Sequence, residues 1–134
     1  MTVAELEAWL ARYKRAWEEH DPEAAARLFA EDAVYRESPF QSALVGRAAI
    51  RGYWNEVARG QRDVSFAAEV LAGGEGRGIA HWSATFTRAG SGRRVELDGV
   101  FVLRFDEVGL CVELQEWWRR RESGPAGGNR HSRP

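Results

Sequence analysis

The spacing of apolar residues predicts a helix at the start of the chain. Apolar positions recur there every three or four residues, which places them on one helical face: Val3, Leu6, Leu10, Tyr13 and Trp17. A second helix start is indicated a few residues later, where an N-cap side chain, a first-turn proline and a first-turn carboxylate follow one another as Asp21, Pro22 and Glu23. We expect a short second helix there, with an inner stripe of Ala25, Leu28 and Phe29.

A third helix is predicted after Gly46, ending near Gly60. Its apolar positions have helical spacing and include a large aromatic pair: Ile50, Tyr53, Trp54 and Val57. Between the second and third helices, residues 33–38 are typical of a short strand, which Pro39 ends.

From Asp63 onward the apolar pattern changes to alternation, which predicts strands. Four are expected, at about residues 64–72, 78–87, 94–105 and 110–120. The intervals between them are rich in residues that tolerate the positive φ of tight turns, so these strands should form antiparallel hairpins. Three helices packed on one face of such a sheet give an α+β domain.

Alternation also separates the two faces of the sheet. One set in the third of these strands should face the helices: Leu97, Gly99, Phe101, Leu103 and Phe105. The opposite set is charged at its ends but carries Val100 and Val102 in its middle. A second copy of the chain would cover such a strip most simply, so we expect a homodimer through the outer face.

Composition narrows the class of protein. A length of 134 residues fits one domain, and its 19 basic and 20 acidic residues nearly cancel, which argues against nucleic acid or a membrane surface as a partner. The sequence has neither a membrane-spanning apolar run nor a signal-peptide pattern, so we expect a cytoplasmic protein. Residues 123–134 have little to bury, which predicts a disordered tail after a domain over residues 1–122.

Cysteine and histidine do not suggest metal chemistry. Cys111 is the single cysteine and stands in a strand-like run, so we expect a packed thiol rather than a nucleophile. The histidines are dispersed, at His20, His81 and His131. We therefore expect no metal site and no cofactor.

The order and spacing of several short motifs resemble the nuclear-transport-factor-2-like superfamily, and its SnoaL-like branch in particular. The pieces that carry the resemblance cover about residues 5 to 120: Tyr13, Asp21-Pro22-Glu23, Leu28-Phe29-Ala30-Glu31-Asp32-Ala33, Pro39-Phe40, Gly46-Arg47-Ala48-Ala49-Ile50, Leu97-Asp98-Gly99, Arg104-Phe105-Asp106 and Glu116-Trp117-Trp118. The resemblance implies a cone-shaped barrel in which three N-terminal helices pack on a curved, mostly antiparallel sheet. Members of the superfamily have an apolar cavity at the open end of the cone, and they include steroid Δ5-isomerases, polyketide cyclases, dehydratases and epoxide hydrolases as well as non-catalytic binders. Fold alone therefore does not choose the chemistry.

Comparison with the steroid isomerases of this superfamily implies an incomplete site. Tyr13 matches their oxyanion-hole tyrosine, but Ser38 stands where they keep the catalytic aspartate. Phe101 stands where they keep the protonated aspartic acid. The resemblance therefore implies that steroid-type isomerisation is not the activity of this chain.

The expected strand registers predict which side chains enter the cone. In the first strand these are Val34, Arg36 and Ser38, so Arg36 should meet Glu116 inside and pair with it. Alternation points Glu37 outward, although a bulge at Pro39 would reverse its direction and make it a further candidate carboxylate. The pair is either a structural ion pair or a functional one, with Glu116 as general base and Arg36 as an anchor, and Tyr13 is a further catalytic candidate. Candidate contacts for a flat or apolar ligand are Trp17, Ser38, Phe40, Trp54, Phe66, Trp82, Phe86, Phe101 and Trp118.

Three functions remain open from the sequence. The chain is an enzyme such as an isomerase, cyclase, dehydratase or hydrolase of a small hydrophobic molecule, a non-catalytic binder of such a molecule, or a dimeric interaction domain with a filled cone. An open cavity in the cone would argue against the third function and for one of the other two, because both of those need room for a ligand.

Overall fold

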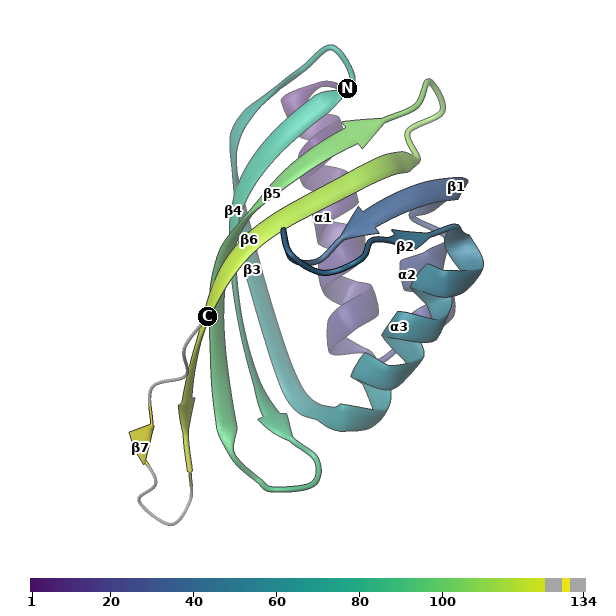
Figure 1. The fold of residues 1–134 in the computed structure, drawn as a ribbon. Helices are drawn as coiled ribbons and strands as arrows, with labels where there is room; N and C mark the ends of the chain where they lie inside the picture. The colour runs from purple at the N-terminus through teal and green to yellow at the C-terminus, as the bar shows by residue number, and fades with distance from the viewer. Residues whose placement is uncertain (125–128, 131–134) are drawn as a thin grey trace.

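The computed structural model describes residues 1–124 and 129–130. Its elements run in the order α1 (Val3–Glu18), α2 (Pro22–Ala26), β1 (Phe29–Arg36), β2 (Leu44–Val45), α3 (Arg47–Gly60), β3 (Gln61–Gly74), β4 (Arg77–Arg88), β5 (Arg94–Phe105), β6 (Cys111–Ser123) and β7 (Asn129–Arg130). A curved, unclosed sheet bends around the three helices (Figure 1). The expected α+β fold is confirmed.

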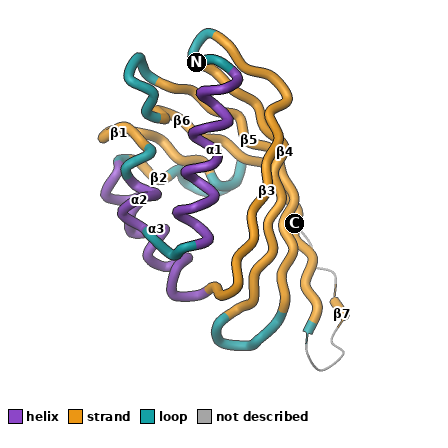
Figure 2. The backbone as a smooth tube through the Cα atoms, turned by 180° about the vertical axis from the view of Figure 1, so that it is seen from behind, coloured by secondary structure: helices purple, strands orange, loops and turns teal. Residues whose placement is uncertain are grey.

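The sheet has the strand order β2-β1-β6-β5-β4-β3, with β7 on the far end of β6. All neighbours are antiparallel except β1 and β6, which run parallel because the chain crosses from one to the other through α3 and the β3–β5 meander. Helix α1 packs along β3, and α2 lies against both α1 and α3 (Figure 2). The helices thus cover the concave face and leave the outer face bare.

Local signals position the helices as the sequence predicts. The Thr2 hydroxyl accepts a hydrogen bond from the Glu5 amide, and the Glu5 carboxylate accepts one from the Thr2 amide, so a capping box starts α1. Asp21 caps α2 by accepting from the Ala24 amide. Gly46, at a φ of 94°, turns the chain into α3 without a side-chain cap.

The second helix is shorter than predicted. It ends at Ala26, and Phe29 is the first residue of β1 rather than part of a helical stripe. Two groups compete with the helix for the Leu28 carbonyl, because the Cys111 amide and the Trp9 indole both donate to it, at 3.0 and 3.1 Å. Docking onto β6 and α1 therefore decides the conformation here, over local helix propensity.

The first strand lies one residue away from the predicted register. Ala33 and Tyr35 are buried, whereas Arg36 is exposed. The predicted inward set of Val34, Arg36 and Ser38 is therefore wrong. In parallel pairing with β6, Tyr35 lies opposite Leu114, and both side chains are in the core.

The four-strand meander matches the prediction closely. The set from Leu97 to Phe105 faces the helices, and Phe101 and Leu103 are almost fully buried. Within the described residues no helix has the length and apolarity needed to cross a membrane. Of the expected disordered tail over residues 123–134, Ser123 is the last residue of β6 and Asn129–Arg130 pair with the end of that strand. Residues 125–128 and 131–134 lie outside the described residues.

Candidate functional site

A cavity of about 190 Å³ lies between the helices and the concave face of the sheet. It opens toward the end of the sheet where β3 begins and β4 ends. Its wall combines aromatic rings with a few polar groups: Tyr13, Trp17, Tyr35, Glu37, Tyr53, Trp54, Val57, Gln61, Trp82, Phe86, Arg88, Leu97, Glu116, Trp118 and Arg120. The helices and the sheet fill the cone only in part.

Aromatic packing fixes the shape of this wall. The Tyr13 ring meets Trp54 edge-on, with ring centroids 5.4 Å apart. Behind the wall, Phe101 stacks on Trp82 with centroids 5.1 Å apart, and Phe66 lies next to both rings, with centroids 6.1 Å from Trp82 and 6.4 Å from Phe101. Such interlocked rings give a rigid surface, because each ring blocks rotation of the next.

Glu116 places a carboxyl group at the inner end of the cavity. Its side chain points inward from β6, opposite Phe101 of β5, and the residue is only 5% exposed. Burial raises the pKa of Glu116 well above its ordinary value, the negative charge of Glu37 raises it further, and a hydrogen bond from Tyr35 acts in the opposite direction. Burial and the charge of Glu37 therefore favour the protonated, neutral form of Glu116, and no ion pair accompanies it among the described residues.

Glu37 brings a second carboxyl group to the same cavity. It follows the end of β1, and the Tyr53 hydroxyl donates a hydrogen bond to its Oε2 at 3.2 Å. The Trp118 indole donates to the backbone carbonyl of Glu37 at 2.9 Å, which ties this segment to β6. Both contacts hold Glu37 over the cavity.

Two further hydroxyl groups connect the helices with Glu116. The hydroxyl oxygens of Tyr13 and Tyr35 lie 3.3 Å apart, and either can donate. Burial raises the pKa of Tyr13, Tyr35 and Tyr53 well above the ordinary value, so each keeps its proton and can act as a donor. The cavity thus holds two carboxyl groups among neutral phenols.

Comparison with models of protein families identifies the family of this chain. Residues 10–114 match the model of the SnoaL-like domain, which is most of the chain. The chain belongs to the SnoaL-like domain family. It is 31% identical over 116 residues to a steroid Delta-isomerase of Nocardioides simplex, covering 86% of this chain and 90% of that protein.

Several solved structures have the same fold as this SnoaL-like domain. One is the epoxide hydrolase/cyclase-like enzyme SalBIII of pyran ring formation in the polyether salinomycin, at a TM-score of 0.76 and 22% identity over 95% of this chain and 97% of that one. Another is RV0760c from Mycobacterium tuberculosis, at a TM-score of 0.78 and 18% identity over 92% and 99% of the two chains. At these identities the likeness concerns the fold alone.

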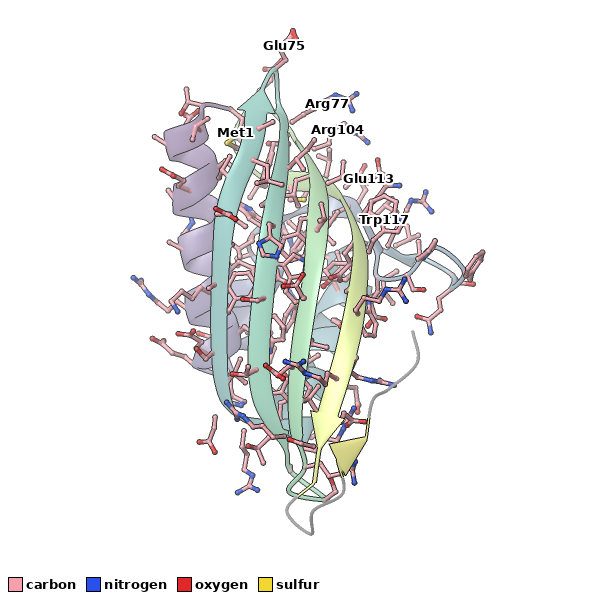
Figure 3. The ribbon with its side chains drawn as sticks, turned by 90° about the vertical axis from the view of Figure 1, so that its left-hand side faces the viewer. Met1, Glu75, Arg77, Arg104, Glu113 and Trp117 are labelled. Carbon is pink, nitrogen blue, oxygen red and sulfur yellow. The ribbon has the colours of Figure 1, made fainter. Side chains whose placement is uncertain are left out.

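The expected pair of Arg36 and Glu116 does not form in this SnoaL-like domain. Arg36 points away from the cavity, and its Nε donates to Glu113 Oε2 at 3.0 Å. Glu113 also pairs with Arg104 on the outer face, at 3.4 Å (Figure 3). The slip of β1 by one residue explains the change, because neighbouring residues of a strand face opposite ways.

The structure brings together most but not all of the predicted contact residues. Tyr13 and Glu116 line the cavity, with five of the predicted ligand contacts: Trp17, Trp54, Trp82, Phe86 and Trp118. Phe66 and Phe101 lie behind that wall. Ser38 is half-buried but not at the cavity, and Phe40 is 98% exposed, because the chain turns away from the sheet after Glu37.

Sequence reasoning missed Tyr35 and gave Glu37 the wrong direction. A signal was present, since Ala33 and Tyr35 are together more apolar than Val34 and Arg36, and the more apolar set of a strand usually faces the core. Arg120 was also missed, although it follows Glu116 and Trp118 on the same alternating face of β6.

Other sites are less well suited to chemistry. A hollow of about 380 Å³ lies outside the cone between α1, α2 and the β5–β6 turn, and it has no buried acid. Among the described residues there is no group of three or more His, Cys, Asp or Glu side chains that could hold a metal ion. Burial raises the pKa of the Cys111 thiol to about 12, which leaves it unreactive.

Proposed function

We propose that this SnoaL-like domain is an enzyme that isomerises a compact, apolar carbonyl compound with its own carboxyl groups. The observation that carries the proposal is a pair of carboxyl groups in one aromatic cavity, in which burial and the charge of Glu37 favour the protonated form of Glu116. Two carboxyl groups in different protonation states supply an acid and a base at the same pH.

The two groups take different roles in this proposal. Glu37 removes a proton from a carbon next to the substrate carbonyl, and Glu116 donates a hydrogen bond to the carbonyl oxygen. The negative charge that develops on that oxygen is stabilised by the Glu116 proton. Returning the proton from Glu37 to another carbon completes the isomerisation with no gain or loss of atoms. Glu116 is thus the acid here, rather than the base expected from the sequence.

Cavity size supports a small substrate. A volume of about 190 Å³ is below the roughly 300–1,000 Å³ of sites for drug-sized ligands. It is somewhat above the ~150 Å³ of an apolar cavity that takes benzene. A substrate with one ring fits this size, whereas a four-ring steroid does not. The sequence argues against steroid-type isomerisation because Ser38 and Phe101 replace the base and one donor. In this proposal Glu37 and Glu116 take those two roles from other positions, so the kinship with a steroid Delta-isomerase supports the reaction class rather than that substrate.

The test uses a β,γ-unsaturated cyclohexenone, whose conversion to the conjugated isomer is followed by ultraviolet absorbance. We expect turnover by the natural protein and a loss of at least ~100-fold in kcat for both Glu116→Gln and Glu37→Gln. Glu113→Gln is the matched control, because Glu113 lies on the same strand as Glu116 but pairs on the outer face. It should keep the natural rate.

Two results would count against the proposal. Natural rates in both cavity variants would remove the acid and base roles. Binding of the conjugated ketone without turnover or proton exchange by the natural protein would instead support a non-catalytic binding domain.

A further inference from the structure

Strand β6 presents three different groups to the cavity at intervals of two residues. Glu116, Trp118 and Arg120 all line it, and they lie opposite Phe101, Gly99 and Leu97 of β5. A strand rises about 3.3 Å per residue, so the Cα atoms of Glu116 and Arg120 are roughly 13 Å apart. A molecule lying along β6 therefore meets an acid at its inner end, an indole in the middle and a guanidinium at the mouth.

Among the described residues, the guanidinium of Arg120 forms no ion pair. Arg120 is half-buried, its Nε is inaccessible to solvent and has no hydrogen-bond partner, and none of the ion pairs among the described residues includes it. Arg88, the other arginine at the mouth, does form an ion pair. Arg88 pairs with Glu122 at 2.5 Å and lies over the Phe86 ring. Within the described part of the chain, Arg88 at the mouth is therefore ion-paired and Arg120 is not.

A half-buried guanidinium beside apolar residues favours an anionic ligand. Leu97 and Phe86 line the cavity near Arg120, and such neighbours strengthen electrostatic attraction by excluding water. A carboxylate matches the planar guanidinium and can accept two parallel hydrogen bonds from it. At the inner end, a neutral Glu116 does not repel an anion.

We propose that the natural substrate is a compact carboxylic acid that also carries a reacting carbonyl group. Its carboxylate binds Arg120 at the mouth, while the carbonyl group and the carbon next to it reach Glu116 and Glu37. This inference rests on the proposed function of the same cavity. Arg120 determines specificity by binding a group that does not react, and the apolar body of the substrate lies along Trp118.

The experiment compares two ligands of nearly the same shape, the anion hydrocinnamate and its neutral amide hydrocinnamamide. Each is titrated into the full chain at neutral pH and followed by calorimetry. We expect the acid to bind at least ~10-fold more tightly than the amide. Arg120→Gln should reduce that preference to about twofold or less.

Arg119→Gln is the matched control, because Arg119 is the next residue of the same strand, is exposed on the opposite face and changes the net charge equally. It should keep the preference for the acid. Equal binding of the two ligands to the natural protein, or an unchanged preference in Arg120→Gln, overturns the role of Arg120 and leaves the acid–base proposal standing. Failure of both ligands to bind at millimolar concentration overturns ligand binding in the cavity and this inference with it.

Discussion

Replacing Glu116 by glutamine should change how the stability of the protein depends on pH. Glu116 is buried, has Glu37 as a negative neighbour, and has a pKa well above its ordinary value of 4.5 in the folded state. Glutamine keeps the shape and a hydrogen-bond donor but has no proton to lose. The difference in unfolding free energy between the two proteins therefore isolates the titration of this one group.

The sign follows from proton binding in the two states. Between the unfolded pKa and the raised folded pKa, the unfolded chain has released the Glu116 proton while the folded protein retains it, so the natural protein loses stability as pH rises. The contribution is fully present below about pH 4.5 and falls by up to about 1.4 kcal/mol for each pH unit above it. Relative to the natural protein, Glu116→Gln should gain stability by that amount per unit.

Urea unfolding at several values between about pH 5 and pH 7 measures this difference. Glu113→Gln is the control, because a hydrogen bond from Arg36 holds the pKa of Glu113 below its ordinary value. Its contribution is present above the unfolded pKa and is lost only as pH falls, so its difference from the natural protein should stay constant over this range. A constant difference for Glu116→Gln as well would refute the raised pKa.

Two further predictions concern packing and assembly. Gly99→Ala should lower the unfolding free energy measured in urea titrations by about 1–3 kcal/mol, because the new Cβ would lie 2.6 Å from the Trp117 carbonyl oxygen and 2.9 Å from the Trp118 Cβ. Gly52→Ala in α3 is the control. Its Cβ would have no atom within 4 Å, so the unfolding free energy should rise by up to about 1 kcal/mol. The homodimer expected from the sequence would cover Trp117 and Ile79, which are 48% and 39% exposed on the outer face, so Trp117→Arg should shift sedimentation toward the monomer. A wild-type protein that sediments as a monomer at all concentrations, or a well-folded Gly99→Ala of natural stability, would contradict these predictions.

The strands differ in how well their sequences predict them. In β5 the inward set from Leu97 to Phe105 is apolar at every position, so one register is far better than the other. In β1 the difference between the two registers is smaller, because Val34 is apolar too, although the set of Ala33 and Tyr35 is the more apolar of the two. The pairing of Tyr35 with Leu114 decides it, and that contact joins residues 79 positions apart, which local patterning does not report.

The same difference explains which site residues could be predicted. Glu116 follows Leu114 on a long strand with clear alternation, so its inward direction was predictable. Arg36 was placed in the cavity by a register that was off by one residue, and the expected ion pair failed with it. Glu37 became a site residue for the same reason. The shift of β1 by one residue therefore removes the guanidinium of Arg36 from the cavity and brings in the carboxylate of Glu37.

The missing ion pair between Arg36 and Glu116 helps to decide whether Glu116 has a structural or a functional role. A buried glutamate that stabilises a fold normally does so through an ion pair, but Arg36 pairs with Glu113 outside. What Glu116 has instead is a hydrogen bond from Tyr35 and a nearby negative charge, and that charge increases the free-energy cost of ionising it. An apolar side chain of similar size would avoid this cost, since a buried polar group opposes folding unless it is well paired. A residue that lowers stability and lies at a cavity wall is better explained by chemistry in the cavity than by packing, because sites that need perturbed carboxyl groups accept such losses.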